Sequence, residues 1–103
     1  MSYDVTIYYG DTDHELFWRN HTSNTAVMWK QAGVDLRDFD GKKANELILP
    51  LIEVIAAMDR DKPRYRALTP TNGWGNFDST VVFLEAVLRA CMTFPDEKLA
   101  VSA

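Results

Sequence analysis

The segment from Asp78 to Phe94 constrains the fold of this 103-residue chain more than any other. Its apolar side chains recur at the spacing of one face of an α-helix, and Pro95 ends the pattern. The stripe consists of Val81, Leu84, Val87, Leu88 and Cys91, widened by Phe83 and Phe94. Such a helix is stabilised mainly by packing its apolar stripe, so the rest of the chain is expected to supply the layer that covers it.

Both ends of the chain have the pattern of β-strands. Residues 3–9 alternate, and the members of one face are Tyr3, Val5, Ile7 and Tyr9. Turn-forming residues 10–13 lead into a second run at 14–22, which predicts an antiparallel hairpin. The short tail, residues 98–103, predicts a third strand.

Residues 22–33 and 42–60 predict helices, and residues 59–68 predict a short extra helical turn. Thr22, Ser23 or Asn24 can cap the first of these, and Gly33 is placed to end it. Pro50 lies inside the second and predicts a kink or a break, because it cannot donate a backbone hydrogen bond to the carbonyl of the residue four positions earlier.

These elements predict an α+β fold. A small antiparallel β-sheet, made of an N-terminal hairpin and a C-terminal strand, packs on one face against three to four α-helices. The length favours a single globular domain over residues 1–103, and a hydrophobic content of 47% is enough for one core.

Charge and composition exclude several classes of function. The net charge is −4 and no Lys/Arg cluster stands out, which argues against a nucleic-acid polymer as partner. The single cysteine, Cys91, excludes an internal disulfide and a zinc site of the paired-cysteine type. No apolar run approaches the ~20 residues of a membrane span, and no signal peptide is visible, so a cytoplasmic location is expected.

No catalytic constellation is recognisable. The sequence contains no HExxH, no GxSxG and no phosphate loop ending in GK[ST], and we expect neither an enzyme nor a bound cofactor. A small hydrolase that uses His14 or His21 is the least favoured hypothesis. A metal ion held in the hairpin turn by His14, Asp11 and Asp13 is a further alternative.

Two segments that precede helices concentrate amide, hydroxyl and aromatic side chains. If the two segments converge, two helix N-termini point near one pocket, and this geometry favours the binding of phosphate. Arg19 would then bind the phosphate of a nucleotide, and Trp18 or Trp74 would stack on its base. The alternative is that these residues are helix caps and core tryptophans. The candidate ligand-binding residues are Trp18, Arg19, Asn20, His21, Thr22, Asn24, Asn72, Trp74 and Asn76.

The motif "TNGWGNFD" contains the most unusual of these residues. Asp78 is expected to be the N-cap of the last helix, with Phe77 and Val82 forming a hydrophobic staple. The glycines on either side of Trp74 allow positive φ or a close approach of the backbone. Trp74 is then either a plug in the core or a wall of a site.

The chain resembles a family of small proteins from phage and bacterial genomes that has no established activity. The matching residues are Tyr3-Asp4-Val5, Asn20 to Asn24, Met28, Ala32-Gly33, Asn72 to Gly75, Phe77-Asp78, Pro95-Asp96 and Val101-Ser102. The resemblance covers nearly the whole chain and implies a common origin and fold. It also implies a phage setting, in which small acidic proteins often block host systems.

Two hypotheses of function follow. The first is a small phage-type binding protein that sequesters a nucleotide-like ligand or otherwise counters a host defence system. The second is a protein-interaction module that docks on a basic surface of a host protein through its acidic loops, Asp11 to Glu15 and Asp35 to Asp40. A homodimer formed through exposed strand edges fits either hypothesis.

Overall fold

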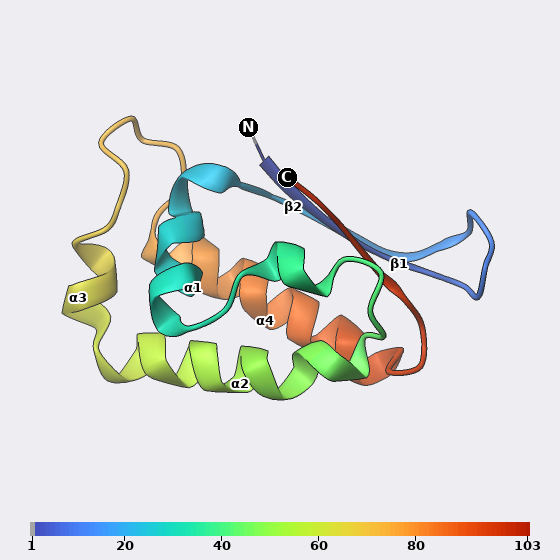
Figure 1. Cartoon of the computed structure of the whole chain (residues 1–103). Coiled ribbons are helices and arrows are strands. Elements are labelled where there is room, and N and C mark those ends of the chain that lie inside the picture. The colour runs from blue at the N-terminus through green and yellow to red at the C-terminus, as the bar shows by residue number, and fades with distance from the viewer. Residues whose placement is uncertain (1) are drawn as a thin grey trace.

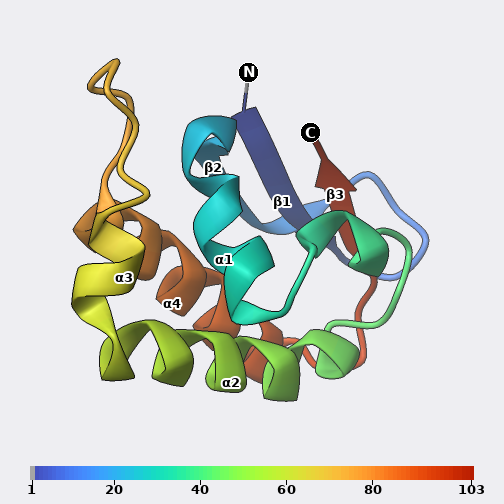
Figure 2. The ribbon, with the colours of Figure 1, turned by 60° about the vertical axis from the view of Figure 1, so that its left-hand side comes forward.

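The computed structural model describes residues 2–103 and confirms the predicted α+β fold. Strands β1 (Ser2–Tyr8), β2 (Glu15–Thr22) and β3 (Leu99–Ser102) form one antiparallel sheet in the order β2-β1-β3. The helices lie on one side of this sheet (Figures 1 and 2). Both the N-terminal hairpin and the C-terminal third strand are therefore as predicted.

The register of the hairpin sorts the side chains of the sheet into two faces. On the face toward the helices, the cross-strand pairs are Tyr3 with His21, Val5 with Arg19 and Ile7 with Phe17. On the outer face, the pairs include Asp4 with Asn20 and Thr6 with Trp18. Tyr9, which the alternation places on the same face as Tyr3, Val5 and Ile7, lies beyond β1 and is exposed.

Six helical segments follow the hairpin within residues 2–103. They are the 3-10 turn η1 (Ser23–Thr25), α1 (Ala26–Ala32), the 3-10 turn η2 (Leu36–Phe39), α2 (Asn45–Arg60), α3 (Lys62–Arg66) and α4 (Phe77–Thr93). Thr22, one of the three predicted caps, accepts a hydrogen bond from the backbone N–H of Asn24. Gly33 ends α1 in the left-handed conformation, with φ of +117°, as its position predicts.

Helix α2 runs without a break through Pro50, so the predicted break is wrong. The hydrogen bond that Pro50 cannot make belongs to the carbonyl of Glu46, the second residue of the helix. The loss is therefore confined to the first turn. Leu47, Leu51 and Val54, which are buried on either side of Pro50, hold the helix to the core by packing.

The start of α4 differs from the prediction by two residues. The N-cap is Asn76 rather than Asp78, because Asn76 and Ser79 form a reciprocal capping box. The Asn76 side chain accepts from the Ser79 N–H at 2.8 Å, and the Asn76 N–H donates to the Ser79 hydroxyl at 3.0 Å. The expected staple is also absent, since Phe77 is buried and Val82 is exposed. Asp78 lies instead in the first turn, where a negative charge favours the helix dipole.

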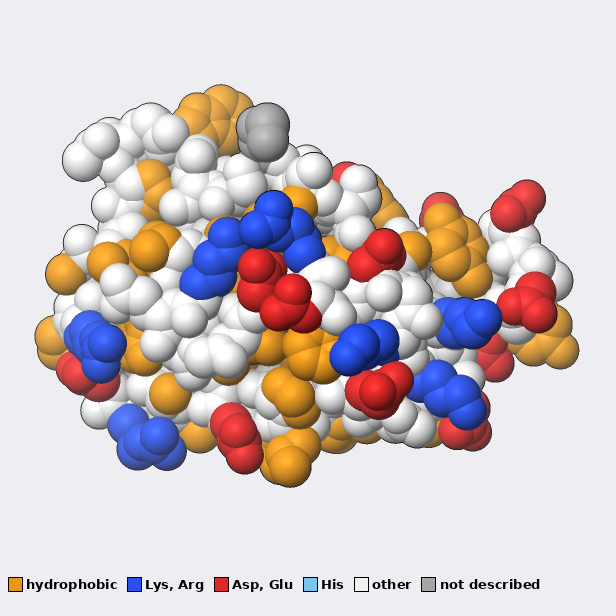
Figure 3. Space-filling view, in the orientation of Figure 1, with side chains coloured by type: hydrophobic (Ala, Val, Ile, Leu, Met, Phe, Trp, Pro, Cys, Tyr) orange, Lys and Arg blue, Asp and Glu red, His pale blue; other side chains and the backbone are white. Residues whose placement is uncertain are grey.

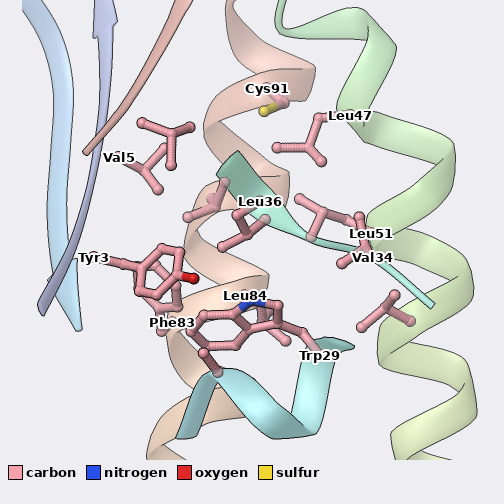
Figure 4. Close-up of a cluster of buried hydrophobic side chains, with 14 of the residues drawn as sticks. Tyr3, Val5, Trp29, Val34, Leu36, Leu47, Leu51, Phe83, Leu84 and Cys91 are labelled. Atoms are coloured by element: carbon pink, nitrogen blue, oxygen red, sulfur yellow. The ribbon is translucent and has the colours of Figure 1, made fainter. Parts of the chain in front are cut away.

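The core lies between the inner face of the sheet and helices α2 and α4 (Figure 4). Tyr3 and Val5 of β1 face side chains from α1, α2 and α4 in this layer. Each large apolar side chain that is fully buried contributes about 1.5–3 kcal/mol. Trp29 of α1 is the largest of these, and its ring meets Tyr3 edge-on with ring centres 5.1 Å apart.

Candidate ligand-binding site

A polar hollow of about 420 Å³ lies where the outer face of the sheet meets the loop before α4. Residues from four separate places line it: Ser2 at the start of β1, Asn20 and Thr22 on β2, Asn24 in η1, and Asn72 and Trp74 in the loop. The two segments that the sequence singled out therefore converge. Five of the candidate residues, Asn20, Thr22, Asn24, Asn72 and Trp74, line one concave surface.

Gly75 accounts for this convergence. It has a φ of +85°, and a Cβ atom at this position would lie 2.6 Å from Cγ2 of Thr22 and 3.0 Å from Cγ2 of Thr25. Only glycine lets the loop backbone come so close to the end of β2. Gly73 also has positive φ, at +79°, with open space around it. Both glycines thus have the role that the sequence predicted.

Trp74 is 67% exposed, so it is not a plug in the core. Its position is set by the backbone of the loop, because the Trp74 N–H donates to Oδ1 of Asn72 at 2.9 Å. The indole forms part of the pocket lining and leaves a large aromatic surface open to a ligand. Of the two sequence interpretations, the core plug is therefore wrong, and Trp74 lines the hollow instead.

The amide and hydroxyl groups of the lining are only partly used within the protein. Nδ2 of Asn20 donates to the Asp4 carboxylate at 2.8 Å, which leaves Oδ1 of Asn20 as an acceptor. Asn72 uses Oδ1 on the loop and keeps its Nδ2 donors. The Asn24 side chain makes no hydrogen bond within residues 2–103. The hollow therefore offers both donors and acceptors beside one aromatic ring.

None of the residues that line this hollow is charged. In the space-filling view, the protruding loop at the upper left is white and orange, whereas most blue and red side chains lie below it or on the right (Figure 3). Arg19, the predicted phosphate ligand, lies on the opposite face of β2, where its guanidinium sits 5.9 Å from the centre of the Phe17 ring. The geometry thus favours an uncharged group over a phosphate.

His21 also faces away from the hollow. Its Nε2 lies 3.0 Å from Oγ1 of Thr25 and 3.2 Å from Oγ1 of Thr80, and its ring stacks on Phe83 at 5.0 Å. Thr80 already donates its hydroxyl proton to the Asn76 carbonyl, so it accepts a hydrogen bond from His21. Burial lowers the pKa of His21, which keeps the ring neutral as a structural donor.

The remaining two candidates have other positions. Asn76 caps α4 through its side chain, as described above. Trp18 is 55% exposed on the outer face of β2, two residues from Asn20, but does not contribute to the lining. Ser2 was missed by the sequence reasoning. The hairpin register could have identified it, because Ser2 lies opposite Thr22.

The catalytic and metal alternatives find no support in the geometry. Thr25 and Thr80, the hydroxyls next to His21, are completely buried and cannot reach a substrate. Within residues 2–103, no group of three His, Cys, Asp or Glu side chains could hold a metal ion, so the alternative of a metal site at His14, Asp11 and Asp13 has no geometric support. Cys91 is buried, and desolvation raises its thiol pKa to about 12.

Several residues of the acidic loops have structural partners. Asp35 caps η2 and pairs with Arg37 at 3.3 Å, and Asp40 accepts a hydrogen bond from the backbone N–H of Val101. Asp11 lies 3.8 Å from the Lys98 ammonium. These contacts explain the positions of three of the acids without a partner protein.

Comparisons with protein-family models, with curated proteins and with solved structures gave no match. In the part of the chain that the structure describes, no helix is long and apolar enough to cross a membrane. The case for a function therefore depends on the geometry of the polar hollow.

Proposed function

We propose that this protein is a small binding protein that captures a nucleotide-like ligand by its base and ribose. One observation carries the proposal: three segments remote in sequence bring amides, hydroxyls and an exposed tryptophan to one uncharged hollow. Nucleobases present flat aromatic faces and edges with mixed donors and acceptors, which match an indole and a ring of amides. In a phage setting, such capture would withdraw a nucleotide signal from a host defence system.

The absence of charged residues in the lining narrows the class of ligand that is expected. Because no cation lines the hollow, phosphate groups of the ligand would stay in water. Free nucleosides should then bind about as tightly as their monophosphates. The affinity should also change little with salt, since screening weakens only interactions between charges.

Calorimetry with the four nucleosides and their monophosphates tests the proposal on the wild-type chain. Trp74→Ala should weaken binding by about 5- to 150-fold, because stacking of one base contributes about 1–3 kcal/mol. Trp18→Ala is the matched control: Trp18 is similarly exposed but lies outside the lining, and this variant should bind like the wild type.

Three results would contradict the proposal. The first is absence of binding at millimolar concentrations of every nucleoside and nucleotide. The second is an equal loss of affinity in Trp18→Ala and Trp74→Ala. The third is binding of monophosphates alone with a steep salt dependence, which would locate the site at a basic surface outside this hollow.

A further inference from the structure

One charged side chain lies on the outer face of the sheet next to the polar hollow. Asp4 of β1 is opposite Asn20 of β2 and two residues from Ser2 on the same face of β1. Asn20 and Ser2 both line the hollow, so Asp4 lies at its rim, although it is not part of the lining. The next pair along the two strands, Thr6 and Trp18, is uncharged. Asp4 is therefore the charged group that this face of the sheet presents to a ligand in the hollow.

The Asp4 carboxylate uses only one of its two oxygens within the protein. Its Oδ1 accepts a hydrogen bond from Nδ2 of Asn20 at 2.8 Å. Within residues 2–103, Oδ2 of Asp4 accepts no hydrogen bond, and no Lys or Arg side chain pairs with this carboxylate. Its neighbours across the two flanking strands, Asn20 and Ser102, are both uncharged. A strong acceptor is thus left available beside the hollow.

The chemistry of this rim matches neighbouring hydroxyl groups. Oδ2 of Asp4 and Oδ1 of Asn20 are two acceptors held side by side, because the hydrogen bond between the two side chains fixes their orientation. The 2′- and 3′-hydroxyls of a ribose are two neighbouring donors, and a hydroxyl donates a stronger hydrogen bond to a carboxylate than to a neutral acceptor. A phosphate has the same sign of charge as Asp4, so this rim would repel it.

We infer, on the basis of the binding function proposed above, that Asp4 recognises the ribose hydroxyls of a ligand whose base stacks on Trp74. The loop that carries Trp74 meets the sheet at Thr22, and Asn20 lies about 7 Å from Thr22 along β2. This spacing is comparable with that between a base and the hydroxyls of its ribose. An acidic side chain holds the ribose in the same way in many dinucleotide-binding proteins. The preferred ligand is then a ribonucleoside rather than a deoxyribonucleoside.

Calorimetry with each of the four ribonucleosides and its 2′-deoxy counterpart tests the role of Asp4, because the two ligands of a pair share one base. The wild-type chain should bind the ribonucleoside more tightly by about tenfold or more, as expected for a hydrogen bond to a charged group. Asp4→Ala should abolish this preference by weakening the binding of the ribonucleoside alone. Asp4→Asn keeps the shape and a neutral acceptor, so it should leave an intermediate preference.

Two further variants separate the sugar from the base. Asp13→Asn is the matched control, because it removes an exposed acid in the hairpin turn, at the opposite end of β2 from the hollow, and it should keep the full preference. Trp74→Ala should weaken the binding of both members of a pair by the same factor and leave their ratio unchanged, since it removes only the stacking on the base. Circular dichroism checks the fold of each variant, and the ratio in the wild-type chain requires no variant.

The possible failures are distinguishable. If the wild-type chain binds both members of every pair equally, or prefers the deoxy form, the role of Asp4 is overturned and the proposed binding function stands. A preference for ribose that Asp4→Ala retains, or that Asp13→Asn also loses, overturns the role of Asp4 as well and locates the recognition of ribose at another residue. Absence of binding by every nucleoside overturns the proposed function and the role of Asp4 together.

Discussion

Two regions of this molecule share one strand and contrast in almost every property. On the inner face of β2, His21 belongs to an aromatic cluster with Tyr3, Trp29 and Phe83. On the outer face, the neighbouring residues Asn20 and Thr22 line an open polar hollow with Trp74. We call these regions the aromatic cluster and the polar hollow.

The contrast shows how residues of similar type receive different roles. Both regions contain a tryptophan and groups that form hydrogen bonds, but the Trp29 side chain is completely buried and that of Trp74 is 67% exposed. In the cluster, His21 forms a hydrogen bond with the buried Thr80, although the buried indole N–H of Trp29 has no partner within residues 2–103. In the hollow, the amides retain unused donors and acceptors. The cluster is therefore expected to determine stability, and the hollow to determine binding.

The largest effect is expected for Trp29→Ala. It should lower the free energy of unfolding by about 3–5 kcal/mol, as truncation of a core tryptophan does, because it opens a cavity among Tyr3, His21 and Phe83. Trp29→Phe should cost much less, since it keeps an aromatic ring and removes a buried indole N–H that has no partner within residues 2–103. Urea unfolding measures both. If Trp29→Ala lowers the free energy of unfolding by less than about 1 kcal/mol, the aromatic cluster does not determine stability as expected.

Gly75→Ala should have the next largest effect, because Gly75 joins the two regions. The new Cβ would collide with Thr22 and Thr25, in addition to the strain of a positive φ, and a cost of about 1–3 kcal/mol is expected. Gly73→Ala is the matched control, because it has similar φ and no neighbouring atom within 4 Å. If the two variants unfold at the same urea concentration, close packing of the loop is not what holds the hollow together.

The pH dependence of stability sharpens the assignment of His21 to the cluster. Burial lowers its pKa below the ordinary value of 6.5, so between these two values the unfolded chain binds more protons than the folded one. Stability is fully present above pH 6.5 and should decrease as the pH falls from 6.5 through the lowered pKa. His21→Gln should remove this component, and His14→Gln, in the exposed hairpin turn, should keep it. An unchanged pH profile in His21→Gln would contradict the assignment.

Trp74→Ala should have the smallest effect on stability, within about 0.5 kcal/mol of the wild type, as is usual for an exposed position. Its thermal unfolding should match that of Trp18→Ala, the other exposed tryptophan. A cost comparable to that of Trp29→Ala would make Trp74 a structural residue and would remove the main support for the proposed ligand site.

Much of the fold could be predicted from local patterns. Alternation over residues 3–9 and 14–22 specified the hairpin, and the apolar stripe after Asp78 specified the last helix, because side-chain period follows directly from backbone geometry. The exact start of α4 was missed, since Asn76 and Asp78 are both good caps and the choice depends on the partner at Ser79.

The candidate site could be predicted only in part. Strand alternation could have separated Arg19 and His21 from Asn20 and Thr22, because odd and even residues of a strand face opposite sides. Which pair lies outside depended on the register with β1, a contact between strands. Asn76 was grouped with the candidate ligand-binding residues because of its amide side chain, although that side chain caps the N-terminus of α4.

By itself, the sequence determined most of the helices and strands of this protein, since helix and strand periods and turn residues act over a few positions. Only the tertiary structure decided that residues 20–24 and 72–74 meet, and that Trp74 lines the polar hollow while Trp29 is buried in the core. The physical reason is that burial and convergence depend on contacts between distant segments. Here they depend on the close approach of Gly75 to Thr22, which no local pattern contains.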